Sequence, residues 1–221
     1  MITERESPEV DMDRCEILAL VEAERLSLAD FLDDLSEREW QTDSLCPGWT
    51  VHDVAAHLTL STRSTFLGML GGVIRAGGDF NKMVATHARA RAARFSPAQL
   101  IAQMRQTAGS PRRAPGTGPL DPLVDALVHG QDIARPLGRV RQMPAVSATV
   151  ALDYVRESSF YGCRERFRGM RLIATDLDWS AGQGPDEIRG PVGDLLLVAT
   201  GRPAGRTALS GAGAERIRAA L

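Results

Sequence analysis

The sequence predicts a mainly α-helical protein in which a four- or five-helix bundle is followed by a small α+β C-terminal unit. Apolar residues recur at helical spacing through most of the first three quarters of the chain. Segments rich in Gly and Pro separate these helices. After Gly162 the pattern changes to β-branched residues with partial alternation, which is typical of a short strand. We therefore expect two domains, residues 1–165 and residues 166–221.

Six helices are expected before that change, each from its apolar spacing and its boundary residues. The first has helical spacing and contains no Gly or Pro. The second follows a turn at Pro47-Gly48, and a Gly-rich patch weakens its far end. Ser96-Pro97 marks the start of the fourth, because Pro is favoured at the first helical position. The expected helices cover residues 11–34, 51–76, 80–94, 97–107, 122–137 and 145–161.

The C-terminal unit is expected to contain a hairpin and short helices. Residues 170–179 predict a strand, and the Gly182–Pro185 segment turns the chain. Glu187–Gly190 can then return as the partner strand. Pro191 opens an apolar helix that runs to about Thr200, and a short helix ends the chain.

Composition excludes several classes of protein. The chain has 221 residues, 43% of them apolar and 24% charged, with a formal net charge of −2. This balance gives no overall electrostatic reason to bind nucleic acid or an anionic membrane. An Arg cluster at Arg89, Arg91 and Arg94 is interpreted either as a solvated helix face or as an anion-attracting rim.

The N-terminus lacks the apolar core of a signal peptide, and no segment approaches the roughly 18 apolar residues needed to span a bilayer. The three cysteines, Cys15, Cys46 and Cys163, are widely spaced and form no C-x-x-C pair. They argue against a disulfide framework and for a reducing cytoplasm, and they exclude a structural zinc site built from cysteines.

One helix start carries a candidate functional histidine. Pro47-Gly48 is turn chemistry, and Thr50 with Asp53 three residues later resembles a capping box, so a helix should begin directly after Thr50. His57 then falls at the border of the apolar face of this helix. Cys46 lies just before the turn. Its thiol could be a ligand or a nucleophile, although a small buried residue is the favoured interpretation.

A second helix is apolar in almost every direction. Residues 122–133 leave only Gln131 and a narrow stripe formed by Asp125, His129 and Asp132. Such a helix should be buried, and its charged stripe must find partners because an unpaired buried carboxylate costs several kcal/mol.

Together the two helices predict a metal site or a buried ion pair. Asp125 and His129 are four residues apart, the spacing at which a helix presents two ligands to one metal. With His57 they form a set of two imidazoles and one carboxylate that leaves coordination positions open, as in catalytic metal sites. The alternative is a buried Asp–His hydrogen-bonded pair. Asp132 either pairs with Arg135 or accepts a hydrogen bond from His129 as a supporting carboxylate.

These residues resemble a known family. The run from Cys46-Pro47-Gly48-Trp49 to Ala56-His57-Leu58, together with Val128–Ile133, is similar to the mycothiol-dependent maleylpyruvate isomerase N-terminal domain family. That family belongs to the DinB-like metal-binding proteins, so the resemblance implies an up-down four-helix bundle. The C-terminal runs Ala174–Trp179 and Gly190–Arg202 resemble the tail of many members.

The resemblance also implies ligands, cofactors and an activity. Zinc in the family is bound by two histidines and a glutamate, which match His57, His129 and Asp125, with Asp here in place of Glu. Arg202 is the candidate for a catalytic arginine of the C-terminal domain. The implied function is a zinc- and mycothiol-dependent isomerase or thiol transferase.

The expected partners of such an enzyme are a small-molecule thiol and an electrophilic substrate. Neither nucleic acid nor a membrane is expected as a partner, and homodimer formation is an option that the sequence leaves undecided. The alternative function is a metal-binding or regulatory protein that kept the bundle without catalysis.

Overall fold

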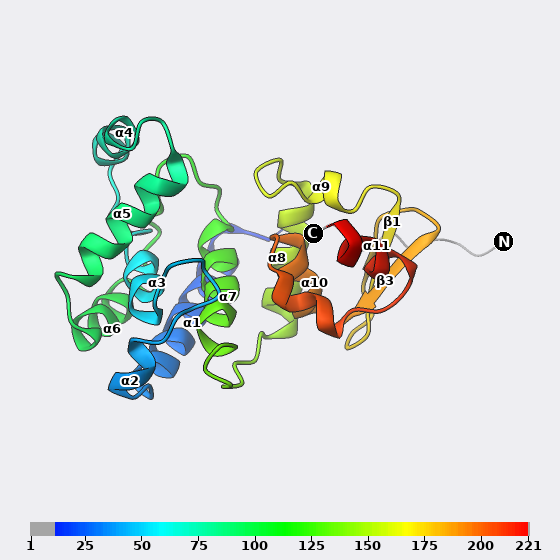
Figure 1. The fold of residues 1–221 in the computed structure, drawn as a ribbon, viewed down its shortest axis with the longest axis horizontal. Helices are drawn as coiled ribbons and strands as arrows, with labels where there is room; N and C mark the ends of the chain where they lie inside the picture. The colour runs from blue at the N-terminus through cyan, green and yellow to red at the C-terminus, as the bar shows by residue number, and fades with distance from the viewer. Residues whose placement is uncertain (1–11, 221) are drawn as a thin grey trace. The chain divides into compact units, whose positions relative to one another are not determined.

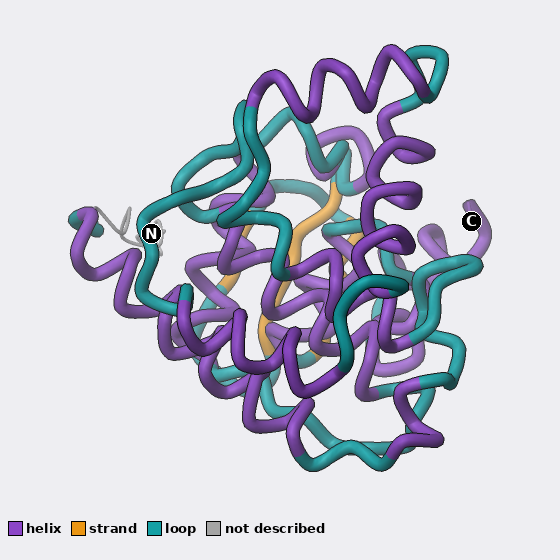
Figure 2. The backbone as a smooth tube through the Cα atoms, turned by 90° about the vertical axis from the view of Figure 1, so that its left-hand side faces the viewer, coloured by secondary structure: helices purple, strands orange, loops and turns teal. Residues whose placement is uncertain are grey.

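The computed structural model describes residues 12–220, and almost all of their regular structure is helical (Figure 1; Figure 2). The described chain falls into two compact units, Asp13–Gln142 and the residues from Met143 onward. The N-terminal unit contains α1 (Arg14–Asp33), α2 (Glu37–Trp40), α3 (Val51–Leu58), α4 (Phe66–Arg75), α5 (Phe80–Ala92), α6 (Pro97–Gln106) and α7 (Asp121–Ala134). The C-terminal unit contains α8 (Ala145–Glu157), α9 (Cys163–Arg166), β1 (Met170–Ala174), β2 (Ser180–Ala181), β3 (Asp186–Gly190), α10 (Val192–Ala199), the 3₁₀ helix η1 (Pro203–Ala208) and α11 (Ala212–Ala220).

The N-terminal unit is a helical bundle built around α1 and α7. A capping box starts α1, because Glu16 N donates to Asp13 Oδ1 at 2.9 Å and Asp13 N donates in return to Glu16 Oε2 at 2.9 Å. The buried side of α1, including Leu28 and Leu32, packs against α6 and α7. α3 packs against α5, α6 and α7, which closes the bundle (Figure 1). The predicted fold class, mainly α with a helical bundle and a small α+β C-terminal unit, is confirmed.

The prediction of one helix over residues 51–76 is wrong, because two helices, α3 and α4, cover this range. The residues between them are rich in Ser and Thr, whose hydroxyls compete for backbone carbonyls. Ser61 Oγ donates to Leu58 O at 3.0 Å, and Ser64 Oγ donates to Leu60 O at 2.9 Å. Thr65 then caps α4 by accepting a hydrogen bond from Gly68 N at 3.2 Å.

The C-terminal unit joins a three-stranded sheet to helices. The strand order is β2-β1-β3, with β2 antiparallel and β3 parallel to β1. A simple hairpin between residues 170–179 and 187–190 is therefore a wrong prediction. β2 occupies the antiparallel position next to β1, so the chain crosses over and β3 pairs along the other edge of β1.

The boundary between the units differs from the one expected at residue 165. α8 was expected in the bundle, whereas in the structure it belongs to the C-terminal unit and packs against α10. The buried side chains of α8 include Ala148, Ala151, Leu152 and Val155. Both α8 and α10 are largely apolar, so each buries its face against the other. The division into functional domains stays a prediction, and residues 1–11 lie outside the described residues.

Within residues 12–220, every helix is too short or too polar to cross a membrane. α1 has 20 residues, but Glu22, Glu24 and Arg25 interrupt its apolar side chains.

Candidate metal centre

α3 positions His57 at the edge of the bundle core. The predicted capping box is present: Asp53 N donates to Thr50 Oγ1 at 3.2 Å, and Thr50 N donates to Asp53 Oδ2 at 3.0 Å. The helix therefore begins at Val51 as predicted. The ring of Trp49 packs edge-on against the half-buried His57 ring, with 5.4 Å between their centroids. The helix cap and this aromatic contact together fix the orientation of the imidazole.

α7 supplies Asp125, His129 and Asp132 from an otherwise buried helix. α7 packs closely against the Arg141 side chain because Gly130 has no side chain. A Cβ at this position would lie only 3.0 Å from Arg141 Nη1. Arg141 in turn pairs with Glu24 at 3.1 Å, and both side chains are 3% exposed. The helix is thus held on the side that does not carry the stripe of functional residues.

His57, Asp125 and His129 converge. One ligand atom from each of the three lies within 4.8 Å of the others. The two imidazole rings meet at a centroid distance of 5.0 Å and an interplanar angle of 78°. The structure therefore brings together the three side chains that the sequence singled out, whereas their role as metal ligands stays a prediction.

A second candidate group shares His129 and contains Cys46 and Asp132. Its ligand atoms also lie within 4.8 Å of one another. His129 Nδ1 is 2.9 Å from Asp132 Oδ2, while Cys46 Sγ is 3.6 Å from the same nitrogen and 3.3 Å from Asp132 Oδ2. Asp132 is therefore a partner of His129, one of the two options left open by the sequence.

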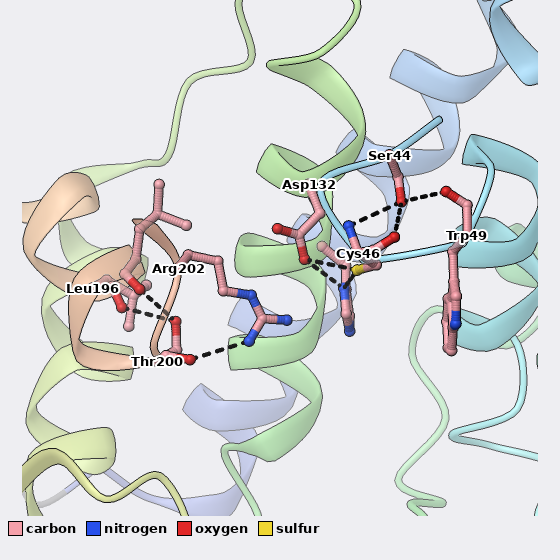
Figure 3. A network of polar contacts seen from close by, with 9 residues as sticks. Ser44, Cys46, Trp49, Asp132, Leu196, Thr200 and Arg202 are labelled. Atoms are coloured by element: carbon pink, nitrogen blue, oxygen red, sulfur yellow. Dashed lines mark hydrogen bonds and ion pairs between the residues drawn. The ribbon is translucent and has the colours of Figure 1, made fainter. Parts of the chain in front are cut away.

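The loop that carries Cys46 is fixed by its own hydrogen bonds (Figure 3). Ser44 Oγ accepts from Cys46 N at 3.1 Å and donates to Trp49 O at 2.8 Å. Leu45 N donates to the backbone carbonyl of Asp132 at 2.9 Å, which ties this loop to α7. Sequence reasoning favoured a small buried residue for Cys46 and did not place its thiol beside His129. The contact between two segments so far apart in the chain is visible only in the fold.

The surroundings of His129 favour its protonated form. Burial lowers the pKa of this imidazole, but hydrogen bonds to Asp132 and Cys46 and the charges of Cys46 and Asp125 outweigh burial and raise the pKa to about 10. A carboxylate can only accept, so the hydrogen in the Asp132 contact belongs to Nδ1 of His129. Nε2 is the nitrogen that remains for a metal, and a bound metal ion must displace a proton from it.

The donor set fits a divalent metal. Two imidazole nitrogens and one carboxylate oxygen are ligands that zinc takes in catalytic sites, where three protein ligands leave a position open for another molecule. A carboxylate that holds the second nitrogen of a ligating histidine, as Asp132 holds His129, is the usual support for such a ligand. The alternative donor set, with a thiol in place of one imidazole, suits a thiophilic metal.

Arg202 lies in the other compact unit, directly after α10. Its Nη1 donates to Thr200 O at 3.1 Å (Figure 3). Its backbone N–H donates to Leu197 O at 2.7 Å. These contacts fix the local chain at the end of α10. The catalytic role of Arg202 stays a prediction.

Of the remaining histidines, His52 has a structural role. Its Nε2 lies 3.0 Å from Phe95 O, and its ring packs edge-on against Trp40 at a centroid distance of 5.6 Å. It therefore joins α3 to the segment before α6 rather than to the candidate metal centre.

Comparisons with known proteins agree with this architecture. A family model described as the mycothiol maleylpyruvate isomerase N-terminal domain matches residues 21–134. A crystal structure of the mycothiol-dependent maleylpyruvate isomerase superposes with a TM-score of 0.57 at 16% identity, covering 91% of this chain and 93% of that one. A variant of that enzyme with a histidine replaced by alanine superposes with a TM-score of 0.56, also at 16% identity and with the same coverage. A search of curated protein sequences gave no match.

Proposed function

Because the chain belongs to the mycothiol maleylpyruvate isomerase N-terminal domain family, we propose that it is an enzyme that uses a divalent metal and a small thiol. The metal is zinc, held by His57, Asp125 and His129. The thiol is mycothiol, and the second substrate is a small electrophile. The convergence of these three side chains within 4.8 Å in a helical bundle of this family is the observation that carries the proposal.

A divalent metal with an open position lowers the pKa of a bound thiol and so supplies a thiolate at neutral pH. The residues of the chain provide the support for this chemistry. Asp132 holds Nδ1 of His129 at 2.9 Å, which fixes the ring and directs Nε2 to the metal. The ring of Trp49 packs edge-on against the His57 ring and restrains it.

The reaction class follows from the thiolate. Its addition to a carbon of a cis double bond, rotation about the resulting single bond and elimination of the same thiolate would give the trans isomer. If the carbanion formed by this addition instead takes up a proton, equivalent to the one the thiol lost, the product is a thioether, which is the outcome of a thiol transferase. Arg202 is proposed to bind a carboxylate of the substrate or thiol, because guanidinium groups pair with carboxylates through two hydrogen bonds.

The test combines metal content with turnover. Purified protein is loaded with zinc and assayed with mycothiol and a maleyl-type acid, beside His129→Ala and Asp125→Glu. We expect one zinc per chain and thiol-dependent turnover in the wild type, loss of both in His129→Ala, and retention of both in Asp125→Glu, since Glu is the residue of the family at this position. Stoichiometric zinc without turnover on any electrophile would contradict the enzymatic proposal.

A second function is favoured by the Cys46 contacts. If the metal were held by Cys46, His129 and Asp132 instead, two of its three donors would be anionic, and the centre would suit tight storage or sensing of a metal. This non-catalytic alternative predicts that Cys46→Ser, and not His57→Ala, removes the metal.

A further inference from the structure

The net charge of the chain conceals an uneven distribution of charge within the N-terminal unit. Residues 54–120 contain nine Lys or Arg and a single carboxylate, Asp79, which gives this stretch a formal charge of +8 in a chain whose total is −2. The stretch includes α4, α5, α6 and the segments that join them. Exposed charges act over only about 8 Å at physiological salt, so a local excess of this size attracts polyanions whatever the total charge.

Three of these cations, Arg63, Arg91 and Arg94, form a cluster. The guanidinium carbons of Arg91 and Arg94 lie 4.6 and 5.4 Å from the centroid of one ring, that of Phe95. Burial and the neighbouring charges of Arg63 and Arg94 lower the pKa of the Arg91 guanidinium. Arg91 donates to an uncharged oxygen, Thr59 Oγ1, at 2.5 Å, and none of the three cations forms an ion pair in the described part of the chain.

The C-terminal ends of α3 and α5 balance only part of this charge. Arg91 contacts Thr59, the C-cap of α3, and itself lies in the last turn of α5. A positive charge is favourable at both places, but each helix end carries only about half a negative elementary charge. The cluster carries three positive charges, so most of its charge is left to an anion from outside the chain.

α4 exposes apolar side chains in the same basic stretch. Leu70 and Ile74 are 48% and 69% exposed, and Phe80, the first residue of α5, is 45% exposed. We call these three residues the apolar strip. Eight large apolar side chains are exposed in the part of the chain that the structure describes, and three of them fall within these eleven residues. Single exposed apolar side chains are common on protein surfaces, whereas a group of them indicates an interaction surface.

The apolar strip and the cluster lie on the same side of α5. Gly72 of α4 faces α5, because a Cβ at this position would lie 2.7 Å from Met83 Cγ. The two α4 residues of the strip are each two positions, or about 200°, from Gly72, so they point away from α5. Figure 1 shows α4 at the periphery of the N-terminal unit, over α5. On α5, Arg91 and Arg94 fall within about 80° of Met83, which is the side that α4 covers.

We propose that α4 and the cluster form a docking surface for an anionic lipid bilayer. The apolar strip enters the boundary between headgroups and acyl chains, and the guanidinium groups bind lipid phosphates. The proposal is independent of the metal centre, and it replaces the expectation, drawn from the net charge, that no membrane is a partner.

Two other occupants fit this surface less well. A second copy of the chain in a two-fold symmetric contact would set the same surface against itself and bring two clusters of like charge together. A nucleic acid would match the positive charge but leave the apolar strip in water. An anionic bilayer offers both phosphates and an apolar interior, so it satisfies both halves of the surface.

The test is co-sedimentation of the whole protein with vesicles of phosphatidylcholine alone or with about one third phosphatidylglycerol. We expect binding to the anionic vesicles only, and release in high salt, because salt screens exposed charges. Arg63→Gln and Arg94→Gln should each weaken binding about fivefold, the contribution of one cation near such a surface. Ile74→Ser should weaken binding about tenfold, because it removes apolar surface that enters the bilayer.

Matched controls lie in the C-terminal unit. Val146→Ser changes a side chain that is 65% exposed, close to the 69% of Ile74, and Arg171→Gln removes an exposed cation. Neither should change binding. Asp79→Asn removes the carboxylate of the basic stretch, and asparagine can still cap α5 by accepting from Lys82 N. This variant should bind anionic vesicles severalfold more tightly and neutral vesicles no better, a result that misfolding would not give.

Equal binding to both kinds of vesicle, no binding to either, unchanged binding by Ile74→Ser or Arg94→Gln, or no gain in Asp79→Asn would each overturn the proposal. Losses in Val146→Ser or Arg171→Gln as large as those in the matched variants would overturn it too. Sedimentation velocity and a DNA duplex test the other occupants. A dimer that Ile74→Ser dissociates, or a duplex that binds through Arg94 while vesicles do not bind, would assign the surface to a second copy or to a nucleic acid instead.

Discussion

The substitution Asp132→Asn distinguishes the two candidate sets of metal ligands. Asp132 only supports His129 in the set His57, Asp125 and His129, whereas it is itself a ligand in the set Cys46, His129 and Asp132. The carboxylate is 1% exposed and lies 2.9 Å from His129 Nδ1. Asparagine keeps the shape and can still accept a hydrogen bond through its amide oxygen, but it loses the negative charge that stabilises a metal-bound imidazole. Substitutions of such supporting residues weaken metal affinity roughly 10- to 100-fold, or about 1.4–2.7 kcal/mol.

The assay is competition of each variant with a chromophoric chelator for zinc at one fixed pH. If His57, Asp125 and His129 hold the metal, His57→Ala removes a direct ligand and must weaken zinc binding more than Asp132→Asn does. Cys46→Ser then changes the affinity little, because its sulfur only contacts His129 and Asp132. The order would reverse for the thiol-containing group. A smaller loss in His57→Ala than in either Cys46→Ser or Asp132→Asn refutes our assignment of the ligands.

Three further predictions concern other parts of the chain. Thr50→Ala removes the hydroxyl that caps α3 and should lower the free energy of unfolding by about 1 kcal/mol in urea denaturation; no change would show that the cap is dispensable. Hydrogen bonds from Arg139 and Ser36 lower the pKa of Glu39 to about 2 from 4.5. The ionised Glu39 thus stabilises the fold above about pH 4.5, and this effect is lost as the pH falls toward 2. The free energy of unfolding of Glu39→Gln, measured against pH, should therefore lie below that of the wild type at pH 6 and converge with it near pH 2. Arg202→Ala should retain stoichiometric zinc and lower kcat or raise KM with mycothiol and a maleyl-type acid; loss of the metal in this variant would show that Arg202 does not act separately from the metal ligands.

Local signals in the sequence were enough to locate the start of α3 and the side chains of the candidate metal centre. Thr50 and Asp53 predict the start of α3 because a capping box involves only adjacent turns of chain. The polar stripe of α7 identifies Asp125 and His129 because every other direction of that helix is apolar and must be buried. His57 joins this candidate ligand set because it lies at the border of the apolar, buried face of its own helix.

Features that depend on packing between distant segments were not predictable in the same way. The contact of Cys46 with His129 depends on how the loop before α3 is tied to α7, and no local pattern encodes it. Membership of α8 in the C-terminal unit depends on the match between two apolar helix faces. The parallel pairing of β1 with β3 was missed because the turn at Gly182–Pro185 is equally compatible with a simple hairpin. The break between α3 and α4 was also missed, although its Ser/Thr-rich composition was a usable signal.

Anomalous diffraction at the zinc edge, from crystals grown with zinc, tests most directly the claim that His57, Asp125 and His129 hold one metal ion. We expect one strong peak about 2.0–2.2 Å from a nitrogen of His57, an oxygen of Asp125 and Nε2 of His129. A peak about 2.3 Å from Cys46 Sγ, on the Nδ1 side of His129, would contradict the claim, as would the absence of any peak at His129.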